Sequence, residues 1–295
     1  MEDLFGNAVV EPKSSNLEKK VAFAISLIKS ASAKAAEIGQ VIEVCYSGGK
    51  DSDVILELAR MSGVPFRAIY KNTTIDPPGT VKHCKDNNVE VVMPKVTFRQ
   101  LIEKSGYPSR LRRMCCDHLK EYKIMDYAII GVRRDESAKR AKRYKEPEIC
   151  RVYNSKEKAR LYMPILEWTL SDVEEFIKRR NIKCAPVYYD ECGNFHPERR
   201  LGCMCCPLAS QKKRLEEFTK YPNMLKLYTR AGKVYMETHP DHQAVKCFKN
   251  EYEMLVYQLF CNNLVEFESK FGSNLFDKGM DCKKFLEDYF NIKFV

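Results

Sequence analysis

Short apolar, β-branched stretches alternate with stretches of helical spacing through the first two thirds of the chain. The former predict strands at residues 41–46, 66–70, 89–93 and 127–132. The latter predict helices at residues 17–38, 54–62, 80–87, 98–104 and 171–180. Because β and α units of this length alternate, we expect an α/β fold built on a doubly wound parallel sheet with right-handed crossovers.

From about residue 215 the apolar spacing is helical and no stretch has a convincing strand pattern. We therefore expect three parts along the chain. These are an N-terminal lead-in and helix at 1–39, an α/β domain at 40–214, and a C-terminal helical appendage at 215–295.

Polar residues follow three of the predicted strands. Ser47, Asn72 and Arg133 each come directly after an apolar stretch. Ligands of doubly wound sheets bind at the carboxyl ends of the strands. The three residues are therefore expected to share one crevice.

The first strand leads into Ser-Gly-Gly-Lys-Asp-Ser at residues 47–52, and a helix follows. The glycines let the backbone approach an anion closely, and the helix N-terminus directs N–H groups and its positive dipole end at that anion. Ser47, Ser52 and the ammonium group of Lys50 add donors. The stretch predicts a phosphate-binding loop, and the alternative is an ordinary strand-to-helix turn.

The composition limits the class of protein, its location in the cell and the charge of its ligands. The 295 residues are 44% hydrophobic and 31% charged, which is typical of a soluble globular protein. The start, Met1-Glu2-Asp3, lacks the pattern of a signal peptide and no stretch is apolar enough to span a membrane, so we expect a cytoplasmic protein without a membrane partner. The net charge of +10 favours anionic ligands, either nucleotide or nucleic acid. Basic residues are densest at 110–145, where a merely solvated basic face is the alternative.

Thirteen cysteines are many for a cytosolic chain. The number is odd and the chain is too long for a disulfide scaffold. Metal, cluster or thiol chemistry is the better explanation, with several cysteines serving as small core residues.

The loop at 47–52 lacks the Walker A spacing and resembles the PP-loop of the adenine nucleotide α-hydrolase superfamily. Three further segments resemble the phosphoadenylyl-sulfate (PAPS) reductase family: Gly131-Val132-Arg133-Arg134-Asp135-Glu136-Ser137-Ala138-Lys139-Arg140, Pro164-Ile165-Leu166-Glu167-Trp168-Thr169, and Ala185-Pro186-Val187-Tyr188. The resemblance covers roughly residues 40–210.

This resemblance implies that the domain holds ATP or an adenylyl sulfate (APS or PAPS). The implied nucleotide-binding residues are Ser47, Gly48, Gly49, Lys50, Ser52, Asn72, Arg133, Glu136, Ser137 and Arg140. Lys50, Asp51 and Arg133 are the implied catalytic residues, with Asp51 helping to hold Mg²⁺. Arginine forks suit bidentate binding of phosphate or sulfate, and Glu136 is placed to orient one of them.

The cysteine spacing resembles the set that binds a [4Fe–4S] cluster in the APS reductase branch. The implied ligands are Cys115, Cys116, Cys203 and Cys206, with Cys192 and Cys205 as spare candidates. Structural zinc and free thiols are the alternatives. The basic neighbours Arg112, Arg113, Arg199 and Arg200 are expected to lower thiol pKa values. His118 and His196 are expected to lie beside the site rather than act as ligands.

One feature departs from the family. Sulfonucleotide reductases use a cysteine on a mobile C-terminal tail, whereas the last cysteine here, Cys282, lies in a stretch of helical appearance. Glu191-Cys192-Gly193 spells a similar motif but precedes the Cys-x-x-Cys. The loop resembles the ATP-pyrophosphatase version, so we expect cleavage of the α–β bond of ATP to activate a substrate for sulfur transfer, as in thiolation of transfer RNA or phosphorothioation of DNA.

The expected partners are a sulfur donor protein or thioredoxin, and a nucleic acid on the basic face. The alternative functions are an APS or PAPS reductase that releases sulfite, and a non-catalytic regulator that binds nucleotide or DNA on the same scaffold.

Overall fold

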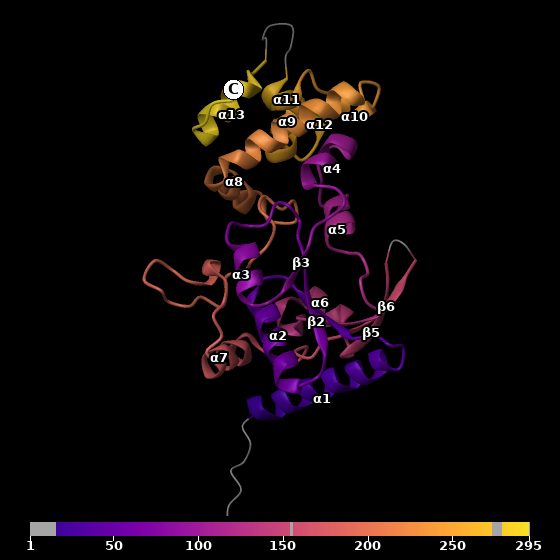
Figure 1. Ribbon diagram of the computed structural model, residues 1–295. Coiled ribbons are helices and arrows are strands. Elements are labelled where there is room, and N and C mark those ends of the chain that lie inside the picture. Colours follow the sequence, from indigo (N-terminus) through magenta and orange to yellow (C-terminus); the bar gives the residue numbers. More distant parts are fainter. Residues whose placement is uncertain (1–15, 154–155, 273–278, 295) are drawn as a thin grey trace, which may run out of the picture. The chain divides into compact units, whose positions relative to one another are not determined.

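The computed structural model describes residues 16–153, 156–272 and 279–294. Contacts divide these residues into two units (Figure 1). The first takes in the described residues up to Tyr70, together with Gly79–Val91 and Lys123–Leu201. The second takes in Lys71–Pro78, Val92–Tyr122 and the described residues from Gly202 onward. Of the predicted lead-in and helix at 1–39, residues 1–15 lie outside the described residues.

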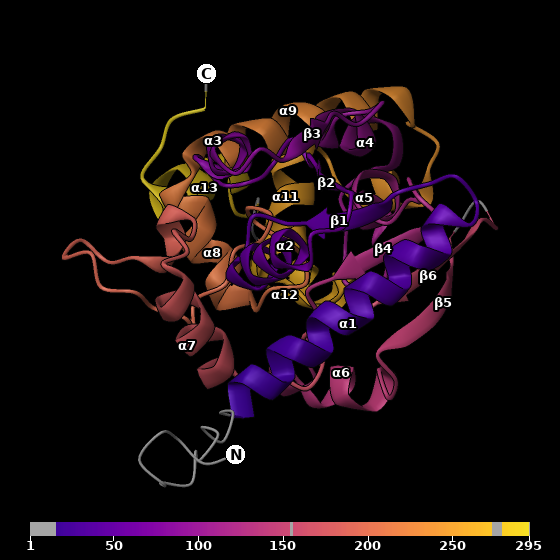
Figure 2. The ribbon, with the colours of Figure 1, turned by 60° about the horizontal axis from the view of Figure 1, so that its bottom comes forward.

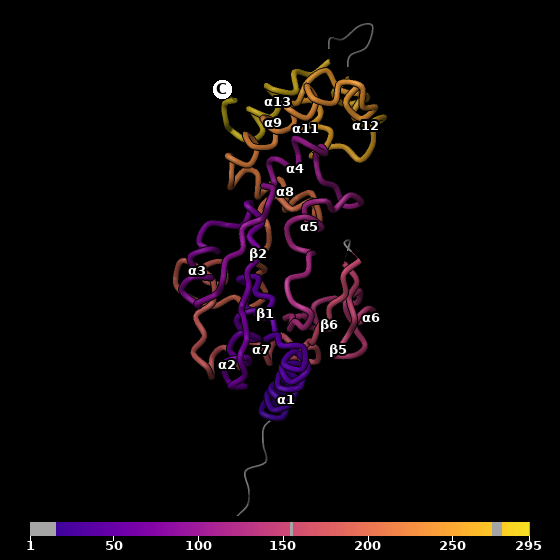
Figure 3. Tube along the Cα trace, turned by 45° about the vertical axis from the view of Figure 1, so that its right-hand side comes forward, coloured from indigo at the N-terminus to yellow at the C-terminus, as the bar shows by residue number. Residues whose placement is uncertain are grey.

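A six-stranded sheet runs in the order β3-β2-β1-β4-β6-β5, and Figure 3 labels β1, β2, β5 and β6 of it. Its strands are β1 (Ile42–Tyr46), β2 (Phe66–Lys71), β3 (Glu90–Val92), β4 (Tyr127–Ile130), β5 (Glu148–Val152) and β6 (Lys158–Tyr162). β1 pairs in parallel with both β2 and β4, and β4 pairs in parallel with β6. The last pair, β5 with β6, is antiparallel. The mostly parallel α/β sheet expected from the sequence is confirmed.

The helices of the first unit are α1 (Asn16–Ala36), α2 (Lys50–Ser62), α3 (Thr80–Asp86), α6 (Ala138–Arg143) and α7 (Leu170–Arg180), with short 3₁₀ turns η1 (Arg134–Glu136) and η2 (Pro186–Tyr188). α1 and α2 pack on each other, and both contact β1 and β4 (Figure 2). Their shared core includes Ile28 of α1, Ile55 of α2 and Val44 of β1, all fully buried. This packing fixes the N-terminus of α2 at the end of β1.

The second unit is helical. Its helices are α4 (Phe98–Ser105), α5 (Met114–Leu119), α8 (Gln211–Lys220), α9 (Pro222–Thr238), α10 (Gln243–Lys246), α11 (Glu251–Phe260), α12 (Leu264–Phe271) and α13 (Cys282–Phe290). α4 and α11 both pack on α9 around a core of their own. In the described part beyond residue 215 there are only helices and connections, so the helical C-terminal region is confirmed.

The predicted strands and helices are all present within a few residues, but β5, β6, α5 and α6 were not predicted. β5 and β6 read Glu-Ile-Cys-Arg-Val and Lys-Ala-Arg-Leu-Tyr, so charged residues interrupt the apolar pattern of this edge hairpin. The domain boundaries at 39 and 214 stay a prediction, because the second unit also draws on two earlier segments of the chain.

Candidate functional site

The order of the strands predicts where in the first unit the crevice expected from the sequence would lie. From β1 the chain adds β2 and β3 on one side, and then β4 and β6 on the other. In doubly wound sheets ligands bind where the order reverses, outside the carboxyl ends of the strands. Residues 47–52 follow β1 and Arg133 follows β4, so both lie at this reversal.

The loop after β1 is held by its own polar groups. Gly48 has a φ of +77°, a conformation that favours glycine. The hydroxyl of Ser47 donates to that of Ser52 over 3.2 Å, and Ser52 donates to the Gly49 carbonyl over 2.7 Å. Gly49 caps α2 and has no side chain, so no side chain of the cap residue accepts from the N–H groups of the first turn.

Two buried cations meet on one carboxylate beside this loop. Lys50 and Arg133 are 4% and 3% exposed. The Lys50 ammonium lies 2.9 Å from Asp51 Oδ2, and Arg133 Nε lies 2.6 Å from Asp51 Oδ1. Gly131 makes this approach possible, because a Cβ there would lie 2.9 Å from the Asp51 carbonyl oxygen.

Tyr188 is part of the site, although its role was not predicted. The Lys50 ammonium lies 5.7 Å from the centre of its ring, and its hydroxyl accepts from the Leu201 N–H over 3.4 Å. Burial raises the pKa of Tyr188 to about 12, so the hydroxyl stays neutral. Tyr188 is the last residue of the Ala-Pro-Val-Tyr segment. Through Tyr188 this segment contacts Lys50 in the loop at 47–52.

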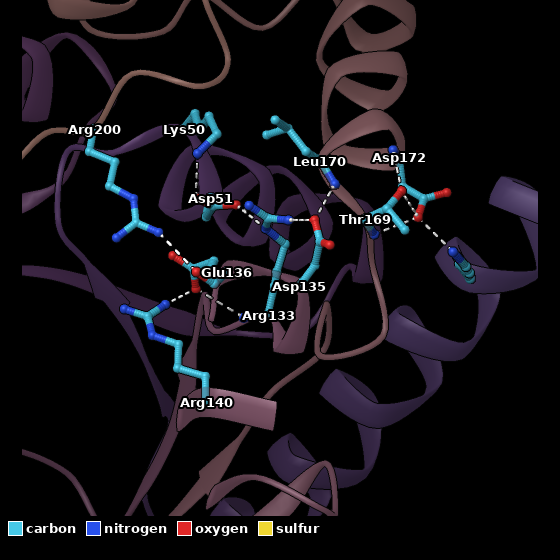
Figure 4. A network of polar contacts seen from close by, with 11 residues as sticks. Lys50, Asp51, Arg133, Asp135, Glu136, Arg140, Thr169, Leu170, Asp172 and Arg200 are labelled. Carbon is cyan, nitrogen blue, oxygen red and sulfur yellow. Dashed lines mark hydrogen bonds and ion pairs between the residues drawn. The ribbon is translucent and has the colours of Figure 1, made fainter. Parts of the chain in front are cut away.

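A second group of charges lies next to Arg133 (Figure 4). Glu136 pairs with Arg140 and accepts from the Arg133 N–H over 3.3 Å. Arg200 donates to the Glu136 carbonyl over 3.2 Å, and was not among the predicted nucleotide-binding residues. The four cations Lys50, Arg133, Arg140 and Arg200 exceed the three carboxylates Asp51, Asp135 and Glu136 by one charge.

Burial and the neighbouring positive charges act on the pKa of Arg140. Burial lowers the pKa of Arg140, and the neighbouring charge of Arg200 lowers it further. An anion bound between these two guanidinium groups would relieve their repulsion. The crevice is therefore suited to an anion rather than a cation.

The Pro164–Thr169 segment and Leu170 contact the residues that follow Arg133 in the sequence. The Leu166 carbonyl accepts from the Arg134 N–H over 2.9 Å, and Trp168 is 2% exposed. Asp135 accepts from the Leu170 N–H over 2.9 Å and pairs with Arg133 at 3.1 Å (Figure 4). The segment thus holds Arg134, and Leu170, which follows it, holds the Asp135 carboxylate that pairs with Arg133.

Two predicted residues have other roles in the described geometry. The Ser137 hydroxyl caps α6 by accepting from the Arg140 N–H over 3.2 Å. Asn72 belongs to the second unit, where its side chain accepts from the Thr74 N–H over 2.6 Å. Both remain predicted, not demonstrated, contacts of a nucleotide.

In the second unit, four thiols line one small cavity of about 20 Å³. They are the predicted set: Cys115, Cys116, Cys203 and Cys206. Cys205 is not among the lining residues; it is buried, with a φ of +54°, and its N–H donates to Glu217. Cys192 belongs to the first unit and is exposed.

The charges around these thiols differ from the expected ones. Lys120 lines the cavity, and the nearby groups Cys203 and Asp76 raise its pKa against the effect of burial. A hydrogen bond from Cys115 lowers the pKa of Cys116 to about 6, and Arg113 contributes to that shift. Arg199 and Arg200 belong to the first unit. Their guanidinium groups donate to backbone carbonyls there. Lys120 directly follows α5, a helix that was not predicted, so this residue was not found from the sequence.

The donor set can be compared with the metals it would suit. In the part of the chain that the structure describes, no three His, Cys, Asp or Glu side chains lie close enough together to hold a single metal ion. A tetrahedral zinc, with Zn–S distances of about 2.3 Å, needs closely gathered sulfurs. A four-iron cluster binds each thiolate through a different iron and accepts wider spacing of the sulfurs than zinc does.

Comparison with known proteins shows which family the α/β part of the chain resembles. Residues 42–209 match the family model described as "Phosphoadenosine phosphosulfate reductase domain". An uncharacterized protein of Methanocaldococcus jannaschii is 30% identical over 223 residues, which are 70% of this chain and 51% of that protein. Sulfate adenylyltransferase subunit 2 of Rhizobium tropici is 27% identical over 50% of this chain and 56% of its own length. The chain thus spans about half the length of these curated relatives.

Among solved structures, PAPS reductase from Candida auris aligns with a TM-score of 0.36 and 14% identity, over 59% of this chain and 90% of that one. Among the described helices, none is both long and apolar enough to cross a membrane.

Proposed function

The chain belongs to the phosphoadenosine phosphosulfate reductase domain family, and on that premise we propose that its first unit binds ATP and cleaves the α–β phosphate bond to activate a substrate for sulfur transfer. A substrate oxygen attacks the α-phosphorus, pyrophosphate leaves, and a sulfur nucleophile then displaces AMP. The observation that carries the proposal is the pair of buried cations, Lys50 and Arg133, that share Asp51 where the strand order reverses.

Asp51 holds these cations as a phosphate would. Burying an ammonium and a guanidinium is costly unless an anion pairs with them, and the Asp51 carboxylate is that anion in the absence of ligand. An arriving pyrophosphate group competes with Asp51 for both cations and displaces the carboxylate. The freed carboxylate suits Mg²⁺, which binds proteins through one or two carboxylates together with substrate phosphates. When bound, Mg²⁺ neutralises charge on the phosphates.

Binding of the nucleotide is tested by titrating the full chain with ATP, pyrophosphate and PAPS. Lys50→Ala and Arg133→Ala should each weaken ATP binding by roughly tenfold to a hundredfold, the usual effect of losing a charge-assisted hydrogen bond. Lys139→Ala removes an exposed charge of α6 and serves as the control for net charge. Equal losses in all three variants, or no binding of any nucleotide, would contradict the proposal.

Asp51→Asn separates binding from cleavage. Without Mg²⁺ this variant should bind pyrophosphate at least as well as the native chain, because no carboxylate competes for Lys50 and Arg133. Formation of AMP and pyrophosphate from ATP with Mg²⁺ should fall by about 10²–10³-fold, as when one charge-stabilising group is lost. A variant that turns over ATP normally would exclude a catalytic role for Asp51.

We propose further that Cys115, Cys116, Cys203 and Cys206 hold a [4Fe–4S] cluster, supported by their shared cavity. When bound, the cluster supplies a redox-active centre. An anaerobic preparation should contain about four iron atoms per chain and absorb in the visible range. Cys115→Ser should lose the iron, whereas Cys247→Ser, at an exposed cysteine of the same unit, should keep it. Zinc in place of iron would overturn the assignment.

The acceptor is proposed to be a nucleic acid. The support is the exposed basic surface of α6, formed by Lys139, Lys142 and Arg143, together with the net charge of +10. Binding of transfer RNA should weaken steeply with salt, with a linear fall of log K against log salt concentration.

Release of sulfite from a sulfonucleotide is the second candidate, favoured by the exposed Cys192. Cys282 is unsuited to act as the nucleophile, since it is 3% exposed at the first turn of α13. Sulfite formed with thioredoxin and abolished by Cys192→Ser would favour the reductase. Nucleotide binding without any turnover would favour the regulator.

A further inference from the structure

A cavity of the first unit lies between α1 and the segment that follows β6. Its volume is about 440 Å³, which is within the usual range for small-molecule sites. Its lining comes from three stretches of the chain, within residues 19–23, 145–147 and 164–168, together with Arg134. None of the residues 47–52 lines it, so this cavity is separate from the phosphate-binding loop.

The walls of this cavity are largely apolar. Leu166 and Trp168 are each 2% exposed, and two prolines, Pro147 and Pro164, also line it. Phe23 lines the same cavity but is 53% exposed. A half-exposed aromatic ring beside buried apolar side chains is suited to stack on a flat ring of a ligand.

Two cations of the lining are already used within the protein. Lys20 pairs with Asp172 at 2.6 Å. Arg134 pairs with Glu167 and donates to the backbone carbonyls of residues 144–145. These contacts connect the stretches that line the cavity, so its walls are held in place before a ligand arrives.

The other two cations, Lys19 and Lys145, are available to a ligand. Both are exposed, and no ion pair joins either of them to a carboxylate among the described residues. The remaining carboxylate of the lining is that of the exposed Glu146. The charges that are not used within the protein therefore favour an anion at the rim of an apolar cavity.

The position of Lys145 connects this cavity to α6. Lys145 stands two residues after the last residue of that helix, whose exposed Lys139, Lys142 and Arg143 form the proposed nucleic-acid surface. Proteins that bind single strands combine positive charges along the phosphates with aromatic side chains on which bases stack. The cavity offers the same combination beside that surface.

We propose that this cavity takes one unpaired base of the acceptor nucleic acid, stacked on Phe23, with the flanking phosphates on Lys19 and Lys145. This inference rests on the proposed nucleic-acid acceptor, and it specifies that a single-stranded stretch is bound. The contacts are made by exposed side chains, so no buried atom has to be uncovered.

The test is calorimetric titration of the full-length chain with a short oligouridylate, whose base differs from the adenine expected at residues 47–52. The fluorescence of Trp168 locates the bound base, because Trp168 is the single tryptophan of the chain and lines the cavity. Binding should be saturable and should change this fluorescence.

Two further ligands separate the base from the phosphates without altering the protein. An abasic strand of equal length keeps the phosphates and should bind at least about fivefold more weakly, because it cannot stack. Uridine monophosphate keeps the base but lacks the neighbouring phosphates, so it should also bind at least about fivefold more weakly.

Phe23→Ala should weaken binding of the oligouridylate by at least about fivefold. Ile38→Ala is the matched control, because Ile38 is an apolar residue of the same unit that is 51% exposed and does not line the cavity. It should leave the affinity unchanged.

Lys145→Ala should reduce the slope of log K against log salt concentration by about 0.7, the value for one phosphate of a single strand. Lys29→Ala removes an exposed lysine of α1 outside the cavity and should leave this slope unchanged.

Equal affinity for the abasic strand or for uridine monophosphate would overturn the proposal. So would unchanged affinity in Phe23→Ala, or constant fluorescence of Trp168. If transfer RNA still bound with a steep salt dependence in that case, the nucleic-acid acceptor would stand without this cavity. Absence of binding by both transfer RNA and the oligouridylate would overturn both proposals.

Discussion

At the scale of single residues, the phosphate loop depends on the backbone of Gly48. Its φ of +77° is costly for other residues, and a Cβ there would lie 3.0 Å from side-chain carbons of both Leu201 and Thr80. The glycine therefore serves two purposes. It permits the turn out of β1 and leaves room for the neighbours that close around the loop.

Gly48→Ala should lower the free energy of unfolding by about 1–2 kcal/mol and weaken pyrophosphate binding by more than about tenfold. Urea unfolding and titration with pyrophosphate measure the two effects. Gly193→Ala is a matched control, because Gly193 has a similar φ of +82° with no atom within 4 Å of an added Cβ. It should show the cost in stability and bind pyrophosphate normally. Normal binding by Gly48→Ala would refute the role given to this residue.

At the scale of elements, helix starts are set by local side chains. α7 begins with a capping box: the Thr169 hydroxyl accepts from the Asp172 N–H over 3.2 Å, and Asp172 accepts from the Thr169 N–H over 2.7 Å. Asp172 also pairs with Lys20 of α1 at 2.6 Å. The start of α7 is thus tied both to its own backbone and to another helix.

Thr169→Ala should destabilise the protein by about 1 kcal/mol, because the Asp172 N–H loses its acceptor. Thermal and urea unfolding measure this change. Ser171→Ala alters an exposed serine of the same helical turn and should stay within about 0.5 kcal/mol of the native value. If the two variants were equally stable, the capping box would have no measurable effect.

At the scale of the whole molecule, the two apolar cores are interleaved along the chain. The core of the second unit joins Phe98 and Ile102 of α4 to Leu225 and Tyr228 of α9. These partners stand more than a hundred residues apart in the sequence. A cut between α4 and α9 therefore separates residues that need each other for burial.

A chain shortened to residues 1–214 should consequently expose α4. Phe98 and Ile102 are 1% and 0% exposed in the intact protein, and each loses about 1.5–3 kcal/mol of burial when α9 is absent. We expect association on size-exclusion chromatography and strong binding of the dye ANS. Coexpression of residues 215–295 should reduce both. A monomeric fragment 1–214 that melts cooperatively would instead support the domain boundary predicted at 214.

The sequence alone determined the features that depend on neighbours in the chain. The strands β1 to β4, the main helices and the loop at 47–52 follow from apolar period and turn chemistry, which are local. The family was also recognised from local motifs, because the residues of each motif are adjacent in the sequence. β5 and β6 escaped detection because charged residues interrupt their apolar positions: β5 is the edge strand, and β6 buries Ala159, Leu161 and Tyr162 between exposed Lys158 and Arg160.

Only the tertiary structure decided which distant groups meet and which of them lose water. The pairing of Arg133 with Asp51 spans 82 residues, and the place of Tyr188 beside Lys50 is equally remote in sequence. The cavity that both Phe23 and Lys145 line has no sequence signal at all. Proximity of this kind comes from the packing of helices on the sheet, and the desolvation that gives these charges their chemistry exists only once that packing is complete.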